Sequence, residues 1–218
     1  MKGMISMDIS KQRYYEKVSN TIIQNLEKRQ IEGYYCFDKK TAVNKALKLI
    51  PSKASISWGG SVTLFETGLM DAIKAEDYKL INREDAKNLD EQRQIHGEIC
   101  CSDFFLMSTN AITLDGELVN IDGRGNRVAF LCYGPQNVLI LAGMNKIVSN
   151  IEEGIKRIRN ISAPPNAIRL NRKTPCSITG KCEDCFSSEC MCGQIVITRR
   201  SIIPGRIKVI LIGEELGY

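Results

Sequence analysis

Residues 108–148, STNAITLDGELVNIDGRGNRVAFLCYGPQNVLILAGMNKIV, decide the fold of this chain. Two apolar runs in this stretch, residues 128–132 and 138–142, are expected to be buried strands. Asparagine, aspartate, arginine and glycine residues crowd beside these runs, and glycine allows positive φ or a close approach of the backbone to a ligand. The stretch therefore predicts one wall of a ligand site. The alternative is a β-hairpin with glycine-rich turns, because Asp-Gly pairs are ordinary hairpin signals.

A second glycine-containing segment is expected to form the opposite wall of this cleft. Residues 54–57 predict a short strand, residues 58–61 (WGGS) a turn, and residues 62–72 a helix. Free backbone N–H groups at a helix N-terminus can bind an anion, although a tight strand-to-helix turn explains the same residues. Glu66 and Asp122 are the candidates for a catalytic base or nucleophile. The candidate ligand-binding residues of both walls are Gly59, Gly60, Ser61, Asn110, Asp115, Asn120, Asp122, Arg124, Asn126, Arg127, Asn145 and Lys146.

Expected helices and strands alternate along much of the chain. The helices are expected at residues 8–30, 40–49, 62–72, 84–95 and 150–160, and the strands at 34–37, 54–57, 78–81, 103–107, 194–198 and 206–212. A hairpin at residues 113–119 and the C-terminal strands would add antiparallel edges. This order favours an α/β three-layer sandwich with a mostly parallel sheet. No linker or repeat is visible, so we expect one domain, residues 1–218, with a cysteine-rich lobe at residues 174–193.

The composition is typical of a cytosolic globular protein. Apolar residues make up 43% and charged residues 25% of the chain, and no apolar run approaches the roughly 20 residues of a membrane-spanning helix. The N-terminal residues lack the apolar centre of a signal peptide, which predicts a cytoplasmic location. The net charge of +5 is spread along the chain and aromatic residues are only 6%, which argues against nucleic-acid binding.

The cysteines indicate metal or redox chemistry. The chain has nine, and five of them lie between Cys176 and Cys192. In a cytosolic protein such clustering favours a metal site over structural disulfides, and the Cys182-x2-Cys185 pair can bind one metal ion with both sulfurs. Thiolates select zinc, copper(I) or an iron–sulfur cluster. A group of redox-active or unreactive thiols remains the alternative.

Several ordered motifs resemble one known family. They are SWGGSVTLFETGLM, FLMSTNAITLDGELVNIDGRGNRVAFLCYGP, LAGMNKIV, APPNAIRL, TPCSITGKCEDC and PGRIKVILIGEELGY, and together they extend over nearly the whole chain. This pattern resembles the LUD-domain family, which includes lactate-utilisation proteins of the LutC/YkgG type. The resemblance implies a fold related to ribose-5-phosphate isomerase and the CoA transferases. It also implies Cys176, Cys182, Cys185 and Cys192 as ligands of zinc or an iron–sulfur cluster, with Cys190 as an alternative.

Three functions are compatible with these features. The resemblance implies a subunit or accessory factor of a system that oxidises L-lactate to pyruvate, with iron–sulfur and oxidoreductase proteins as partners and a small anionic metabolite in the cleft. A stand-alone enzyme or binding protein for a phosphorylated or CoA-linked metabolite is the second hypothesis, and a non-catalytic sensor or scaffold is the third. The chain has no HExxH, Walker, dinucleotide or hydrolase motif, so catalysis itself and self-association stay open.

Overall fold

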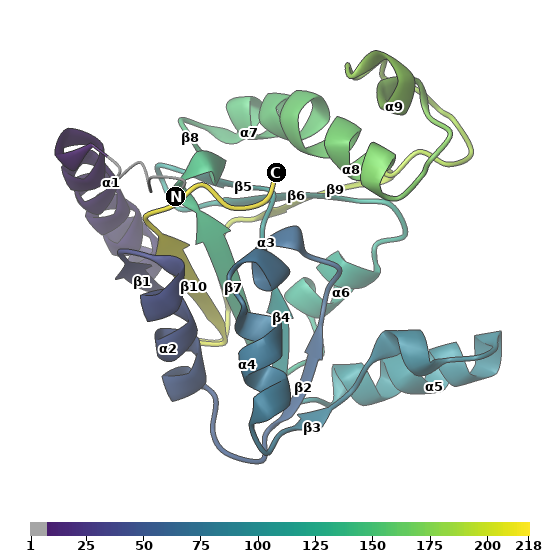
Figure 1. Ribbon diagram of the computed structural model, residues 1–218, viewed down its shortest axis with the longest axis horizontal. Helices are drawn as coiled ribbons and strands as arrows, with labels where there is room; N and C mark the ends of the chain where they lie inside the picture. The colour runs from purple at the N-terminus through teal and green to yellow at the C-terminus, as the bar shows by residue number, and fades with distance from the viewer. Residues whose placement is uncertain (1–7) are drawn as a thin grey trace, which may run out of the picture.

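A six-stranded parallel sheet forms the centre of the computed structural model, which describes residues 8–218 (Figure 1). In spatial order its strands are β1 (Glu32–Cys36), β10 (Ile207–Ile212), β7 (Asn137–Gly143), β4 (Phe104–Met107), β2 (Ser55–Trp58) and β3 (Lys79–Leu80). The central strands β10 and β7 are almost continuously apolar and buried, as expected for parallel strands covered on both faces. The prediction of an α/β fold with a mostly parallel sheet is confirmed. The prediction of antiparallel edges on this sheet is wrong, because β10 is a parallel inner strand and the hairpin and β9 (Gln194–Thr198) belong to a second sheet.

Three helices cover one face of this sheet. They are α2 (Lys39–Leu49), α3 (Val62–Glu66) and α4 (Leu69–Ala75). Ala42, Leu69 and Ile73 of these helices pack with Ile56 and Leu139 of the sheet in one buried cluster. The two alanines of α2, four residues apart, let its backbone approach the strands closely because their side chains are small.

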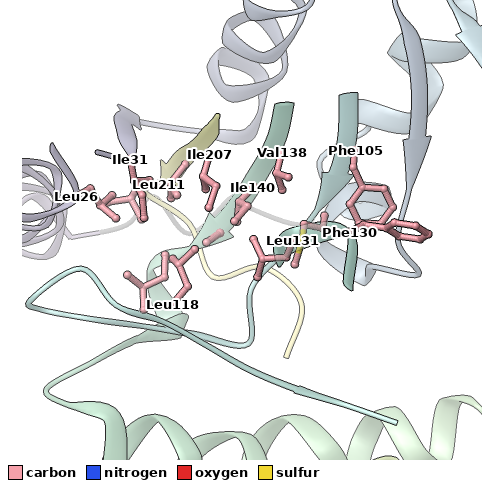
Figure 2. Close-up of a cluster of buried hydrophobic side chains, with 14 of the residues drawn as sticks. Leu26, Ile31, Phe105, Leu118, Phe130, Leu131, Val138, Ile140, Ile207 and Leu211 are labelled. Carbon is pink, nitrogen blue, oxygen red and sulfur yellow. The ribbon is translucent and has the colours of Figure 1, made fainter. Parts of the chain in front are cut away.

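The opposite face carries helices and a second, smaller sheet. The helices are α1 (Ile9–Lys28), α5 (Leu89–Cys100) and α6 (Asn126–Cys132), and the small sheet has the order β8 (Ile147–Val148), β5 (Ala111–Thr113), β6 (Leu118–Asp122) and β9 (Gln194–Thr198). Figure 2 shows Leu26, Leu118 and Leu131 in one buried cluster with Val138 and Ile140 of β7. The small sheet thus supplies part of the main core.

A further helical segment lies over the outer face of the small sheet (Figure 1). It consists of α7 (Ile151–Arg157), a π-helical turn (Ile158–Ser162) and α8 (Ala163–Arg169). The chain continues through α9 (Pro175–Thr179) and a loop before it enters β9. None of the helices in residues 8–218 combines the length and apolarity required to cross a membrane.

The connections of the main sheet diverge between β2 and β4. The helix pair α3–α4 that follows β2 packs on one face, whereas β5, β6 and α6, which follow β4, pack on the other. In open α/β sheets, adjacent strands whose connections leave to opposite faces form a crevice outside their carboxyl ends, where ligands bind. A ligand site is therefore expected among the residues that follow β2, β4 and β7.

The prediction of a buried strand at residues 128–132 is wrong. These residues belong to α6, which begins after Gly125 in the left-handed conformation (φ 84°). Val128 and Leu131, three residues apart, are buried on one side of this helix, and Cys132 is exposed. A short apolar run does not distinguish a strand from a buried helical turn, because both periodicities fit so few residues.

Several helix ends also differ from the predicted ones. The helix expected at residues 62–72 is interrupted by Gly68 (φ 78°), which separates α3 from α4. Ser61 caps α3 by accepting a hydrogen bond from Leu64 N. The helix expected from residue 84 starts only at Leu89. The helix expected at residues 150–160 begins with Asn150 as the cap of α7, and the Asn150 side chain accepts a hydrogen bond from Glu153 N.

Candidate functional site

Lys146 joins the segments that follow β2, β4 and β7. It lies in a 3-10 turn (Met144–Lys146) directly after β7 and is only 3% exposed. Its Nζ donates to Thr63 Oγ1 at 2.8 Å and to Ser108 Oγ at 2.9 Å. Thr63 follows β2 in the chain and Ser108 follows β4, so the lysine bridges the crevice between the diverging connections.

The surroundings of Lys146 disfavour its charged form. Burial, followed by the positive charges of Arg157 and Arg127, lowers the pKa of Lys146 from 10.5 to about 7, while Glu66 acts in the opposite direction. None of the ion pairs formed within residues 8–218 includes Lys146. A buried amine with hydroxyl partners and cationic neighbours loses its proton easily, because neither water nor a close carboxylate stabilises the ammonium.

All three guanidinium nitrogens of Arg127 contact protein acceptors at the site. Nη1 donates to Asn120 Oδ1 at 2.7 Å and Ser108 O at 3.2 Å, and Nη2 donates to Asn110 Oδ1 at 2.9 Å and Ile121 O at 3.0 Å. Its Nε lies 3.3 Å from Asp122 Oδ2. The five N–H groups of the guanidinium are therefore directed at protein acceptors, and Arg127 fixes the ends of β4 and β6 rather than offering donors to a ligand.

Arg157, by contrast, keeps one nitrogen uncommitted. Its Nε donates to Asn145 O at 2.9 Å, and its Nη1 donates to Asn110 O at 2.9 Å and Ser162 Oγ at 2.8 Å. Its Nη2 makes no hydrogen bond with any described residue. Asn120 holds a second free donor: its Nδ2 is buried without a partner among the described residues. The site thus has unused donors beside a net positive charge.

Residues 216–217 lie across this site. Asn145 accepts from Leu216 N at 3.1 Å through Oδ1 and donates to Gly217 O at 3.0 Å through Nδ2. Glu66 Oε2 accepts from Gly217 N at 2.7 Å. A Cβ atom on Gly217 would lie 3.4 Å from Lys146 Nζ, which shows how closely the backbone covers the amine.

The structure brings together some of the predicted ligand residues and separates others. Asn110, Asn120, Asp122, Arg127, Asn145 and Lys146 belong to the cluster. Gly59 borders it, since a Cβ atom there would lie 3.4 Å from Arg127 Cδ, while Ser61 serves as the cap of α3. Gly60 faces Arg83, whose Nη2 would lie 2.9 Å from a Cβ atom on this glycine. Arg124 and Asn126 lie on and just after the loop that leads into α6, and neither contributes a hydrogen bond to the cluster.

Asp115 lies at the opposite end of the β5–β6 hairpin. Its carbonyl accepts from Arg29 Nε at 2.7 Å, and it lines a surface pocket of about 300 Å³ together with Arg199 and Arg200. The two predicted catalytic carboxylates are both engaged: Glu66 accepts from Gly217 N, and Asp122 accepts from Gly125 N at 3.0 Å and pairs with Arg127.

Sequence reasoning missed three residues of the cluster. Ser108 could have been found, because it immediately follows a buried parallel strand and such strands direct the next residue toward the crevice. Thr63 falls inside the helix expected at residues 62–72, where a threonine carries no signal of a ligand site. Arg157 gave no local signal, since it sits near the end of a helix where a basic side chain is commonplace.

The five clustered cysteines line a cavity of about 430 Å³ in the lobe after α8. Burial, followed by the neighbouring Cys190, Cys182 and Cys176, raises the pKa of the Cys192 thiol to about 12. These thiols are close enough to influence one another, yet in the part of the chain that the structure describes no three His, Cys, Asp or Glu side chains are grouped so as to hold a metal ion. None of the nine cysteines forms a disulfide.

The lobe is attached to the main body by few polar contacts. Asp184 pairs with Arg159 at 2.9 Å, and Glu189 accepts from Lys173 N at 2.8 Å. Gly193 packs directly on the chain after β6, because a Cβ atom there would lie 2.7 Å from Gly123 O. The cysteine cavity and the Lys146 site are therefore linked through the short segment that follows β6.

The chain is similar to one family model and to solved structures of other proteins. The family model of the LUD domain matches residues 20–212. The structure of a DUF162 family protein from Deinococcus radiodurans aligns with a TM-score of 0.54 and 11% identity, covering 91% of this chain and 98% of that chain. Ribose 5-phosphate isomerase A from Neisseria gonorrhoeae aligns with a TM-score of 0.35 and 16% identity over 52% of this chain and 54% of that chain. No curated protein matches. The chain therefore belongs to the LUD-domain family, a family related to lactate utilisation.

Proposed function

We propose that the Lys146 site binds a small anionic metabolite, and that the chain acts as a subunit or accessory factor of an L-lactate-oxidising electron-transfer system. The observation that carries the proposal is the unbalanced charge of the site. Arg127 is paired with Asp122, but Lys146 and Arg157 have no carboxylate within ion-pair distance among the described residues. Buried charges are normally paired, so an anion is the group that this site lacks.

The free donors of the site suit a carboxylate or a phosphate. Arg157 Nη2 and Asn120 Nδ2 are available, and Lys146 supplies charge when protonated. The crevice position is the usual place for ligands in open α/β sheets. Family membership favours L-lactate or pyruvate as the anion. Since residues 216–217 cover Lys146, the anion reaches it only after the hydrogen bonds of this segment to Asn145 and Glu66 open.

Binding of small anions should depend on Lys146 and on pH. An anion next to the ammonium raises the lysine pKa, so binding takes up a proton, and affinity should fall by up to about tenfold per pH unit above pH 7. In calorimetry with L-lactate, pyruvate and phosphate, Lys146→Met should weaken binding at least about tenfold. Lys156→Met, an exposed lysine on α7, is the matched control and should bind normally.

Two outcomes of this titration would count against the proposal. The site assignment fails if no small anion binds the unaltered protein, or if Lys146→Met binds as tightly as the control. A sugar phosphate and a CoA thioester are titrated in the same way. Tighter binding of either one than of L-lactate would instead favour a stand-alone enzyme or binding protein. The exposed Glu66 carboxylate, which interacts electrostatically with Lys146 at the rim, is the feature that favours this second candidate.

We also propose that Cys176, Cys182, Cys185 and Cys192 bind zinc or an iron–sulfur cluster, with Cys190 as an alternative ligand. The support is the donor set, because five thiols line one cavity on a short loop. The thiols would have to lose protons and move together, which the few contacts of the lobe permit. An iron–sulfur cluster would transfer electrons to oxidoreductase partners, whereas zinc would stabilise the fold of the lobe.

Metal analysis of anaerobically purified protein tests this second proposal. We expect about one zinc ion, or iron with sulfide and a visible absorption band, per chain. The double variant Cys176→Ser/Cys182→Ser should lose the metal. Cys100→Ser/Cys132→Ser, which changes two exposed cysteines outside the lobe, should retain it. Metal-free, colourless unaltered protein purified under reducing conditions would rule the site out.

A further inference from the structure

The hydrogen bonds around Lys146 leave its nitrogen lone pair free when the amine is neutral. Thr63 Oγ1 donates to Leu216 O at 3.3 Å, and Ser108 Oγ donates to Thr109 O at 3.3 Å. Each hydroxyl oxygen therefore acts as an acceptor toward Lys146 Nζ. A neutral amine has two N–H groups, and these two acceptors use both of them. The lone pair is then directed at neither hydroxyl.

The environment also keeps much of this amine neutral near pH 7. Burial and the charges of Arg157 and Arg127 lower the pKa of Lys146 to about 7. Compared with an ordinary lysine of pKa 10.5, the neutral fraction at pH 7 is larger by about three orders of magnitude. Desolvation and a neighbouring cation are the two conditions that turn a lysine into a nucleophile toward carbonyl compounds.

The charge of the site selects the class of carbonyl compound. Arg157 Nη2 has no partner among the described residues, and the buried Asn120 Nδ2 is a second free donor. A carbonyl compound that also carries a carboxylate offers an acceptor for these donors and a carbonyl carbon for the amine. The smallest metabolites that combine both groups are the 2-oxo acids. A neutral aldehyde would leave the arginine unpaired.

We propose that Lys146 forms a reversible imine with the carbonyl carbon of a small 2-oxo acid bound at the proposed anion site. In the forward step, Nζ forms a bond to the carbonyl carbon and both amine protons leave with the carbonyl oxygen as water. Hydrolysis by one water molecule restores the amine and the 2-oxo acid. No oxidant or reductant takes part. The inference rests on the proposed function, because the carboxylate must first bind beside Lys146.

Borohydride trapping tests the imine directly. The protein is incubated with pyruvate and sodium cyanoborohydride, and intact-mass and peptide mass spectrometry then locate the reduced adduct. We expect one adduct per chain, on the peptide that contains Lys146. With pyruvate well below saturation, the yield should rise between about pH 6 and pH 8, because the amine of the unliganded protein loses its proton in this range. L-Lactate has no carbonyl group and should give no adduct. Lys146→Arg and Lys146→Met should lose the adduct, whereas Lys156→Met should keep it.

The outcomes separate this inference from the proposed function. If calorimetry shows that pyruvate binds at Lys146 but no adduct forms there, the imine is wrong and the anion site stands. Adducts spread evenly over exposed lysines would also overturn the imine. If neither pyruvate, L-lactate nor phosphate binds, both proposals fail together. Circular dichroism of the Lys146 variants confirms that any loss of adduct comes from a folded protein.

Discussion

Replacing Arg127 with methionine should lower the free energy of unfolding by about 3–5 kcal/mol, the usual effect of removing one partner of a buried ion pair. The arginine has a side chain only 16% exposed, and Asp122, its partner, has one only 9% exposed. Methionine fills a similar volume but donates no hydrogen bond. Asp122 would keep an uncompensated charge, and the oxygens of Asn110 and Asn120 would lose their arginine donor.

Urea denaturation followed by circular dichroism measures this loss. Arg124→Met is the matched control, because Arg124 lies three residues earlier, is exposed and should change the free energy of unfolding by less than about 0.5 kcal/mol. A loss below about 1 kcal/mol for Arg127→Met would mean that the five contacts are weak or replaceable by water. In that case Arg127 would be available for ligand binding, as its sequence context suggested.

The main sheet was predictable because its strands carry an unambiguous signal. The strands β10 and β7 are apolar at nearly every position, and parallel strands buried on both faces require this. The segment that became α6 has an equally apolar run, but it is too short to show a period. Its helical state depends on the left-handed turn at Gly125 and on packing of Val128 and Leu131, which are tertiary features.

The candidate site was only partly predictable for a related reason. Asn110 and Asp115 occupy similar polar, turn-rich stretches, yet the antiparallel pairing of β5 with β6 places them at opposite ends of one hairpin. Lys146 and Thr63 are 83 residues apart in the chain, so their contact depends on the order of the sheet. Cysteine spacing predicted that the thiols share one region, but spacing cannot fix the directions in which their side chains point.

The contribution of Lys146 to the free energy of unfolding should increase with pH above neutrality. Because the pKa of Lys146 is about 7 in the folded protein and 10.5 is its ordinary value, the unfolded chain binds more protons between these pH values. The free energy of unfolding therefore rises with pH across this window, and a pKa difference of this size corresponds to roughly 3–6 kcal/mol. Lys146→Met lacks the titrating group and should lack this component of the rise.

Urea denaturation of both proteins at several pH values between about 6 and 10 tests this prediction. The difference between their free energies of unfolding cancels the contributions of the tyrosines and other lysines that titrate in the same range. The methionine variant should be the more stable protein at the acid end, where the unaltered protein carries a buried ammonium, and this advantage should shrink as pH rises. Lys156→Met should follow the unaltered protein throughout. Parallel curves for the unaltered protein and Lys146→Met would show that Lys146 is charged across the range.

A saturating anion should flatten this pH dependence. A carboxylate or phosphate bound beside Lys146 stabilises the ammonium, which moves the folded-state pKa back toward 10.5 and reduces the difference from the unfolded chain. The same denaturation series with phosphate should therefore show a smaller rise with pH for the unaltered protein and no change in slope for Lys146→Met. If phosphate stabilises both proteins equally at every pH, it binds elsewhere, for example in the basic pocket beside Arg199 and Arg200.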